Sequence, residues 1–178
     1  MALKRKIWLW SAVFLVVVLG GALVFARPIR MRLLINKTYY YQNKGDFDAA
    51  LRLARELMEQ YPGRPELPQR YAEVALWRAR WLADQKQPGA ARQILDSALE
   101  LVPTDRKILE FLLYLDRAYF FDYARARNLA QRLVEDDPDN LTALYTLADT
   151  GYNYNAPGKI PPELDHYLEL ASKRQLTD

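Results

Sequence analysis

Three segments of the chain repeat one arrangement of small residues, large apolar residues and a closing proline. The segments are DFDAALRLARELMEQYP, QPGAARQILDSALELVP and DYARARNLAQRLVEDDP, and they end at Pro62, Pro103 and Pro138. Twelve residues before each proline stands an alanine, at Ala50, Ala91 and Ala126. A small residue lets a helix pack closely on its neighbour, and a proline beyond the last turn stops the helix. The pattern therefore predicts three copies of one helix with one stop signal.

The rest of the chain after about residue 27 also has apolar residues at helical spacing, and no stretch shows the strict alternation of a strand. Proline, glycine and aspartate pairs separate the periodic stretches. The expected helices span 28–43, 47–60, 66–84, 89–101, 105–119, 122–135, 140–152 and 162–174. Asp105 and Asp139 are expected N-caps, because their carboxylates can accept free amide protons of the first turn. The sequence predicts an all-α domain over residues 28–178, preceded by a segment of different character at 1–27.

The repeated segments resemble the tetratricopeptide repeat (TPR) family. Gly45, Phe47, Ala50 and Pro62 match its glycine, aromatic, alanine and proline landmarks in register, and Tyr41 matches the aromatic residue of the preceding helix. The resemblance covers about residues 30–140. It implies a TPR-like α-solenoid of three to four helical hairpins, in which residues 140–174 form a degenerate fourth hairpin.

The second and third copies depart from the family's pattern. Lys86 and Phe121 stand where the family has glycine, and Pro88 replaces the aromatic residue. The copies are 41 and then 35 residues apart, compared with about 34 in the family. We expect the longer spacing to be absorbed by about two extra turns in helix 66–84, around Trp77 and Trp81.

The resemblance also implies a binding surface, because alternate positions on the first helix of each TPR hairpin face a concave groove that takes a protein partner. Most aromatic residues of these helices are needed for the core. The register places the following residues in the groove: Tyr39, Gln42, Phe111, Leu115, Tyr119, Tyr145, Asp149 and Tyr152. The same register also places Arg80 in the groove, within the lengthened helix 66–84. The lysine and asparagine set with which some members clamp a C-terminal carboxylate is missing, which disfavours binding of chaperone tails.

Residues 7–26 carry no charge and read IWLWSAVFLVVVLGGALVFA. About twenty apolar residues, rising about 1.5 Å each, match a hydrocarbon core of about 30 Å. Trp8 and Trp10 stand where aromatic residues meet the membrane interface. Gly20 and Gly21 are small enough for close contact with another helix, although the run contains no GxxxG pair. We therefore predict a single transmembrane helix that anchors the chain in the lipid bilayer.

A cleaved secretory signal is the competing interpretation, since Val24-Phe25-Ala26 offers small residues after a basic start. The apolar run is longer than the usual 7–15 residues, which favours retention. Positive residues flank both ends, but a short tail with Lys4, Arg5 and Lys6 is costly to translocate. We expect a single-pass protein of a bacterial inner membrane with its domain in the periplasm. The bacterial source is inferred from 17 arginines against eight lysines.

Composition argues against several other classes of function. Of 25 basic residues, six flank the apolar run, leaving 19 against 22 acids, so the domain lacks the basic character of a nucleic-acid binder. There is no cysteine, and His166 is the only histidine. The acidic cluster at 135–139 lacks the spacing of a calcium loop. We expect no catalytic residues, no metal, no cofactor and no small-molecule substrate.

Two functions remain open at this stage. The first is a non-catalytic membrane-anchored scaffold that binds a protein partner through the groove, in the assembly of an envelope complex. The second is an accessory subunit of a membrane complex, of the exopolysaccharide, secretion or cytochrome-maturation kind, in which the transmembrane helix is itself an interface.

Overall fold

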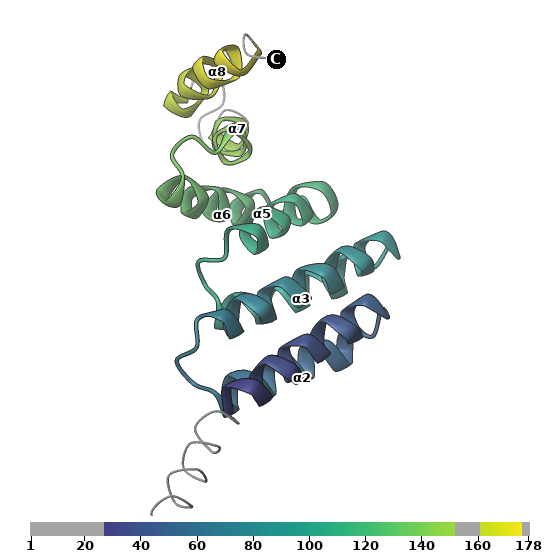
Figure 1. The fold of residues 1–178 in the computed structure, drawn as a ribbon. Coiled ribbons are helices and arrows are strands. Elements are labelled where there is room, and N and C mark those ends of the chain that lie inside the picture. Colours follow the sequence, from purple (N-terminus) through teal and green to yellow (C-terminus); the bar gives the residue numbers. More distant parts are fainter. Residues whose placement is uncertain (1–26, 152–160, 176–178) are drawn as a thin grey trace, which may run out of the picture. The chain divides into compact units, whose positions relative to one another are not determined.

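The computed structural model describes residues 27–151 and 161–175 (Figure 1). The predicted membrane segment 7–26 and the predicted groove residue Tyr152 lie outside the described residues. Within the described ranges, no helix is both long enough and apolar enough to cross a bilayer. The chain divides into two compact units, and the division falls between Arg70 and Tyr71.

The described residues are almost entirely helical and contain no strand. A first helix runs over residues 27–43. The elements that follow are α2 (Phe47–Gln60), α3 (Glu66–Asp84), α4 (Pro88–Leu101), α5 (Arg106–Leu115), the π-helical segment η1 (Asp116–Phe120), α6 (Tyr123–Asp136), α7 (Leu141–Thr150) and α8 (Pro162–Gln175). These bounds confirm the expected helices to within a few residues, except that the helix predicted over 105–119 changes from α to π geometry at Asp116. At 19 residues α3 is the longest helix of residues 47–175, as the extra spacing predicted.

In residues 27–70, the first helix packs one face on α2 and on the beginning of α3. Met31, Leu57 and Leu67 form one buried apolar cluster of this unit. Partly buried apolar residues surround them, namely Leu34, Ile35, Leu53, Met58 and Tyr61. A helix that buries one stripe in this way leaves its opposite face to solvent.

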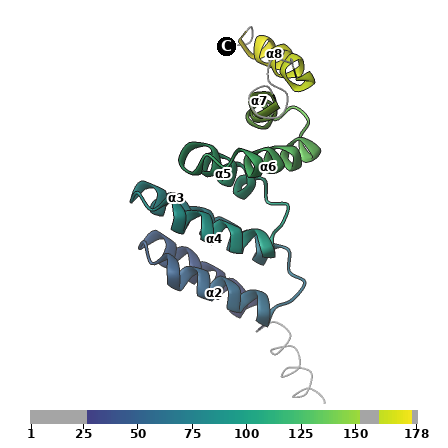
Figure 2. The same ribbon diagram turned by 180° about the vertical axis from the view of Figure 1, so that it is seen from behind.

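In residues 71–175, each of the later helices packs on its neighbour in the chain. α5 contacts α4 and α6, α6 contacts α7, and α7 contacts α8, and Figure 2 shows α4 to α8 from the side opposite to Figure 1. The largest fully buried side chains of these five helices are Leu95, Ile108, Leu112, Leu113, Leu115, Leu133, Thr146 and Thr150. The predicted close-packing alanines Ala91 and Ala126 are completely buried, as is Ala50 in α2, which confirms the register of the repeats.

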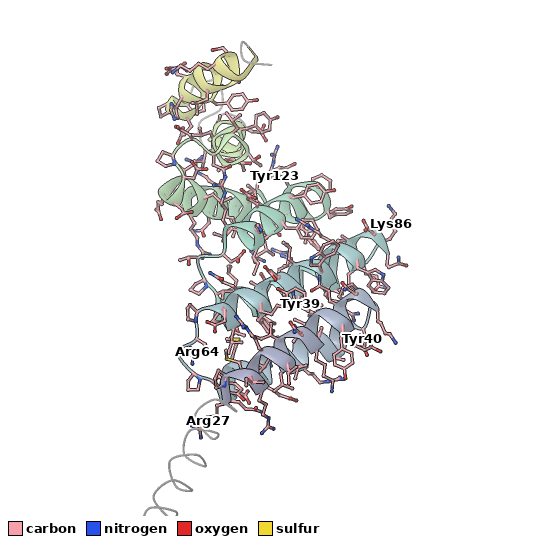
Figure 3. All side chains as sticks on the ribbon, viewed as in Figure 1. Arg27, Tyr39, Tyr40, Arg64, Lys86 and Tyr123 are labelled. Atoms are coloured by element: carbon pink, nitrogen blue, oxygen red, sulfur yellow. The ribbon has the colours of Figure 1, made fainter. Side chains whose placement is uncertain are left out.

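In each of three hairpins one turn joins the two helices, and the three turns are equivalent. Their central residues, Gly45, Lys86 and Phe121, all have positive φ, at 76°, 60° and 52°. Only glycine adopts this left-handed conformation without steric cost. The two non-glycine residues therefore keep the family's turn at the expense of backbone strain, and Figure 3 shows Lys86 at the tip of its turn.

Side-chain caps start four of the helices. The carboxylate of Asp105 accepts from the Ile108 amide at 3.0 Å, which confirms its predicted role. The prediction for Asp139 is wrong, because Asn140 caps α7 by accepting from the Ala143 amide at 3.0 Å. Asp139 instead contacts the His166 Nε2 at 3.2 Å.

Candidate protein-binding surface

Exposed aromatic rings gather on α5, η1 and α7 in the unit formed by residues 71–175. Tyr114, Tyr119 and Tyr145 are exposed, and Tyr114 is 49% exposed. Phe111 and Tyr167 are half-buried beside them. We call these five residues the aromatic face. Monomeric proteins bury most of their large aromatic side chains, so a cluster that stays in solvent is a candidate for binding a partner.

The rings of the aromatic face contact one another in two groups, one on α5 and η1 and one between α7 and α8. Phe111 stacks on Tyr114 with centroids 5.8 Å apart, and Tyr114 meets Tyr119 edge to face at 6.0 Å. Tyr145 contacts Tyr167 of α8 at 5.6 Å. A hydrogen bond with Tyr119 raises the pKa of the Tyr114 hydroxyl. These contacts fix the ring positions before any partner binds, which reduces the entropy lost on binding.

Two arginines lie against the aromatic face. The Arg80 guanidinium of α3 lies 5.8 Å from the Phe111 ring centre, and that of Arg117 lies 4.8 Å from the Tyr145 ring. Arg117 also donates to the Thr146 hydroxyl at 3.3 Å and pairs with Asp149 at 3.7 Å. The surface therefore combines flat apolar rings with positive charge, the two features most enriched in protein-binding hot spots.

The π segment corrects the predicted surface at one position. Asp46 and Gln87 each donate an amide hydrogen bond to the carbonyl five residues earlier, at Tyr41 and Leu82, whereas Asp122 bonds to the carbonyl of Asp116, six residues earlier. One extra residue is thus held within η1, and the repeat spacing of 35 exceeds the family's by that residue.

Leu115 consequently turns inward. It stands six residues before Phe121, as Tyr39 does before Gly45, and for this reason counting along the chain assigned both residues to the groove. The extra residue gives that place to Tyr114. Leu115 is 0% exposed and belongs to the core. The sequence missed two residues of the aromatic face, Tyr114 and Tyr167, and the 35-residue spacing was the signal for Tyr114.

A buried ionic cluster supports η1. Asp116 is completely buried, and its carboxylate pairs with Arg92 Nε of α4 at 2.9 Å and Arg125 Nε of α6 at 3.2 Å. Arg92 also contacts Asp122 at 2.8 Å, and Arg125 also pairs with Asp96. This cluster joins α4, η1 and α6, and the Arg92 guanidinium also lies 4.7 Å from the Phe120 ring centre.

The pKa values of the two acids Asp116 and Asp122 are shifted in opposite directions. Burial raises the pKa of the Asp116 carboxyl to about 6, although Arg125 and Arg92 both favour its charged form. Hydrogen bonds from the Arg92 side chain and the Arg125 amide lower the pKa of Asp122. Desolvation exceeds ion pairing only at the fully buried position.

The two predicted residues in the unit of residues 27–70 form a separate cluster. The Arg70 guanidinium lies 3.4 Å from the Tyr39 ring centre. The same side chain donates to the Thr38 hydroxyl at 2.7 Å and to the Gln42 amide oxygen at 2.6 Å. Tyr39 remains exposed, whereas Gln42 is half-buried and engaged with Arg70.

The remaining predicted positions carry no further chemistry. Asp149 is half-buried and paired with Arg117. His166 lies at the surface beside Asp139. In the part of the chain that the structure describes, no group of three or more histidine, cysteine, aspartate or glutamate side chains is placed to hold a metal ion.

Comparison with known proteins agrees with this geometry. A model of the tetratricopeptide repeat family matches residues 43–112. The matched segment is shorter than half of the chain. It includes α2, α3 and α4 with most of α5. The left-handed turns at Gly45 and Lys86 and the buried Ala50 and Ala91 lie within this segment. No curated protein sequence matches the chain.

Two solved TPR-like structures have the same fold. One is YrrB, described as a TPR protein with an unusual peptide-binding site, with a TM-score of 0.50, 16% identity, and coverage of 80% of this chain and 87% of that chain. The other is the MamA protein, with a TM-score of 0.50, 14% identity, and coverage of 82% and 93%. These likenesses show an all-α TPR-like helical solenoid.

Proposed function

We propose that this protein is a non-catalytic scaffold that is anchored in a bacterial inner membrane and holds a protein partner against the aromatic face. The observation that carries the proposal is the set of exposed and half-buried rings on α5, η1, α7 and α8, which contact one another in two groups. Buried rings would support only a structural role. Peptide binding is stated for YrrB, which has the same fold.

The chemistry of the aromatic face favours a partner segment with apolar or aromatic side chains and an acidic group. Rings bind apolar side chains over a wide area, and the Arg80 guanidinium beside Phe111 offers charge to a carboxylate. Because the rings follow successive turns of α5 and continue on α7, a helix or an extended peptide fits better than a compact domain.

The decisive experiment is capture of the partner by the full-length protein in its native membrane. A photoactivatable residue placed at Tyr114 crosslinks the bound protein, which is then identified by mass spectrometry. Tyr119→Ala and Tyr145→Ala should each weaken capture about tenfold or more, as expected for aromatic hot spots. The melting point should hold in both variants. Leu101→Ala, which removes an exposed apolar side chain from α4, is the matched control and should not change capture.

The same experiment separates the scaffold from the accessory subunit with an interacting membrane helix. Gly20→Leu and Gly21→Leu enlarge the small residues of the apolar run and would block close helix contact. If these variants lose the partner while the tyrosine variants keep it, the membrane helix is the interface and the aromatic face is not. Loss in the tyrosine variants alone supports the scaffold.

Orientation is tested separately with reporter fusions at the C-terminus. A periplasmic reporter should be active and a cytoplasmic reporter inactive, because the short cationic tail at residues 4–6 favours the cytoplasm. The opposite pattern would reverse the orientation. A mature protein that begins at Arg27 would show that the apolar run is a cleaved signal.

A further inference from the structure

The first helix carries an apolar stripe that the fold leaves uncovered. Ile29, Leu33 and Tyr40 are 58%, 63% and 53% exposed. Ile29, Leu33, Asn36 and Tyr40 are separated by four, three and four residues, and this spacing aligns the four side chains on one face of a helix. The opposite face holds the core residue Met31 and the buried Thr38. The stripe is therefore a second amphipathic face and not a frayed part of the core.

Positive charge borders this stripe on both sides. At about 100° per residue, Arg32 falls on one side of the stripe, and Arg30, Lys37 and Lys44 fall on the other. Lys44 lies 4.7 Å from the Tyr40 ring centre and Lys37 lies 5.5 Å from the Tyr41 ring. No aspartate or glutamate occurs before Asp46. Figure 3 labels Arg27 and Tyr40 near the two ends of this helix.

An apolar stripe bordered by cations matches the boundary of an anionic membrane. Apolar side chains of such a helix enter the region between headgroups and acyl chains, while lysine and arginine reach lipid phosphates. A partner protein would instead be expected to bring matching acids, and Tyr40 of the stripe also suits a membrane interface because its ring is apolar and its hydroxyl is polar. The uncharged run 7–26 ends next to Arg27, so a membrane-anchored chain starts this helix at the bilayer.

We infer that the helix over residues 27–43 lies along the surface of an anionic bilayer, with Ile29, Leu33 and Tyr40 inserted below the headgroups and Arg30, Arg32 and Lys37 on lipid phosphates. The inference rests on the proposed membrane anchoring, and adds a second contact that depends on lipid charge. It would hold the first repeat at the membrane and thereby orient the helices that follow in its unit.

The test uses the full-length protein in vesicles, and the absence of cysteine allows a single label to be placed. Leu33→Cys carries an environment-sensitive fluorophore, and Glu56→Cys on the exposed side of α2 carries the same fluorophore as a control. Vesicles contain phosphatidylglycerol and phosphatidylethanolamine, or phosphatidylcholine alone, each with a lipid quencher near the headgroups. The label at Leu33 should be quenched roughly threefold more strongly in the anionic vesicles, and more strongly than the label at Glu56 in both.

Two double variants that remove the same charge, one inside and one outside the proposed contact, test the role of the lipid phosphates. Arg30→Gln with Arg32→Gln, in the chain labelled at Leu33, should lower quenching in anionic vesicles to the phosphatidylcholine level. Arg52→Gln with Arg64→Gln removes the same charge from exposed positions of the same unit and should leave quenching unchanged.

Each other outcome refutes a defined part of the proposal. A label at Leu33 that is quenched no more than the label at Glu56 overturns the surface contact while the anchor stands. A label that is shielded from water but not quenched by lipid shows that a second copy or another protein covers the stripe. A chain that does not float with vesicles refutes the anchor and the surface contact together.

Discussion

Asp116→Asn should change how the stability of the domain depends on pH. A carboxyl whose pKa is raised in the folded chain binds its proton more tightly there than in the unfolded chain. The stability that it contributes is therefore fully present below about pH 4 and is lost as the pH rises through about 6. The difference between 3.8 and about 6 corresponds to about 3 kcal/mol, because one pKa unit is worth about 1.4 kcal/mol. Asparagine has nearly the same shape and does not titrate.

The measurement is urea denaturation of the wild-type and variant proteins, followed by the helical circular-dichroism signal between pH 4 and pH 7.5. The free energy of unfolding of the wild type, minus that of the variant, should fall by about 2–3 kcal/mol across this range. Glu135→Gln removes an exposed acid and controls for the loss of one negative charge. A difference that stays constant or rises with pH would refute the reasoning, since it would show that Arg92 and Arg125 more than compensate for the burial of Asp116.

Three further predictions address the repeats. Ala91→Leu and Ala126→Leu should each lower the free energy of unfolding by about 1–3 kcal/mol, because both alanines are completely buried and a larger side chain overpacks the core; denaturant titration measures this. His166→Ala should change it by less than about 0.5 kcal/mol in the same assay, because the ring lies at the surface, and the reverse order would contradict the repeat register. Lys86→Gly should raise the melting temperature, with a gain of about 1 kcal/mol, because glycine relieves the positive φ; an unchanged or lower melting temperature would show that the turn is unstrained.

The helices and their register could be predicted from the sequence because they depend on local patterns. The alanines twelve residues before each proline predicted the buried positions at Ala50, Ala91 and Ala126. The family's glycine position predicted the turn residues, and the left-handed backbone of Lys86 and Phe121 shows that geometry is kept where the residue type is not.

The features that the sequence did not predict depend either on one inserted residue or on contacts between several helices. The inward position of Leu115 follows from the π geometry of η1, and no single residue in DRAYF signals that geometry. The sequence analysis did not identify Arg92, Asp116 and Arg125, because 24 and nine residues separate them along the chain. Their pairing requires three packed helices. The cap of α7 was misassigned by one position because both Asp139 and Asn140 can cap a helix.

The π segment also determines how the chain tolerates a change in its length. An insertion inside an α-helix rotates every later residue by about 100° and moves its buried side chains toward solvent. In this protein the π geometry of η1 accommodates the additional residue. Phe121 therefore still forms the turn, and Ala126 still reaches the buried position of its helix. A change in length at η1 is thus uncoupled from the packing of α6, and its effect is confined to which side chain lies on the aromatic face.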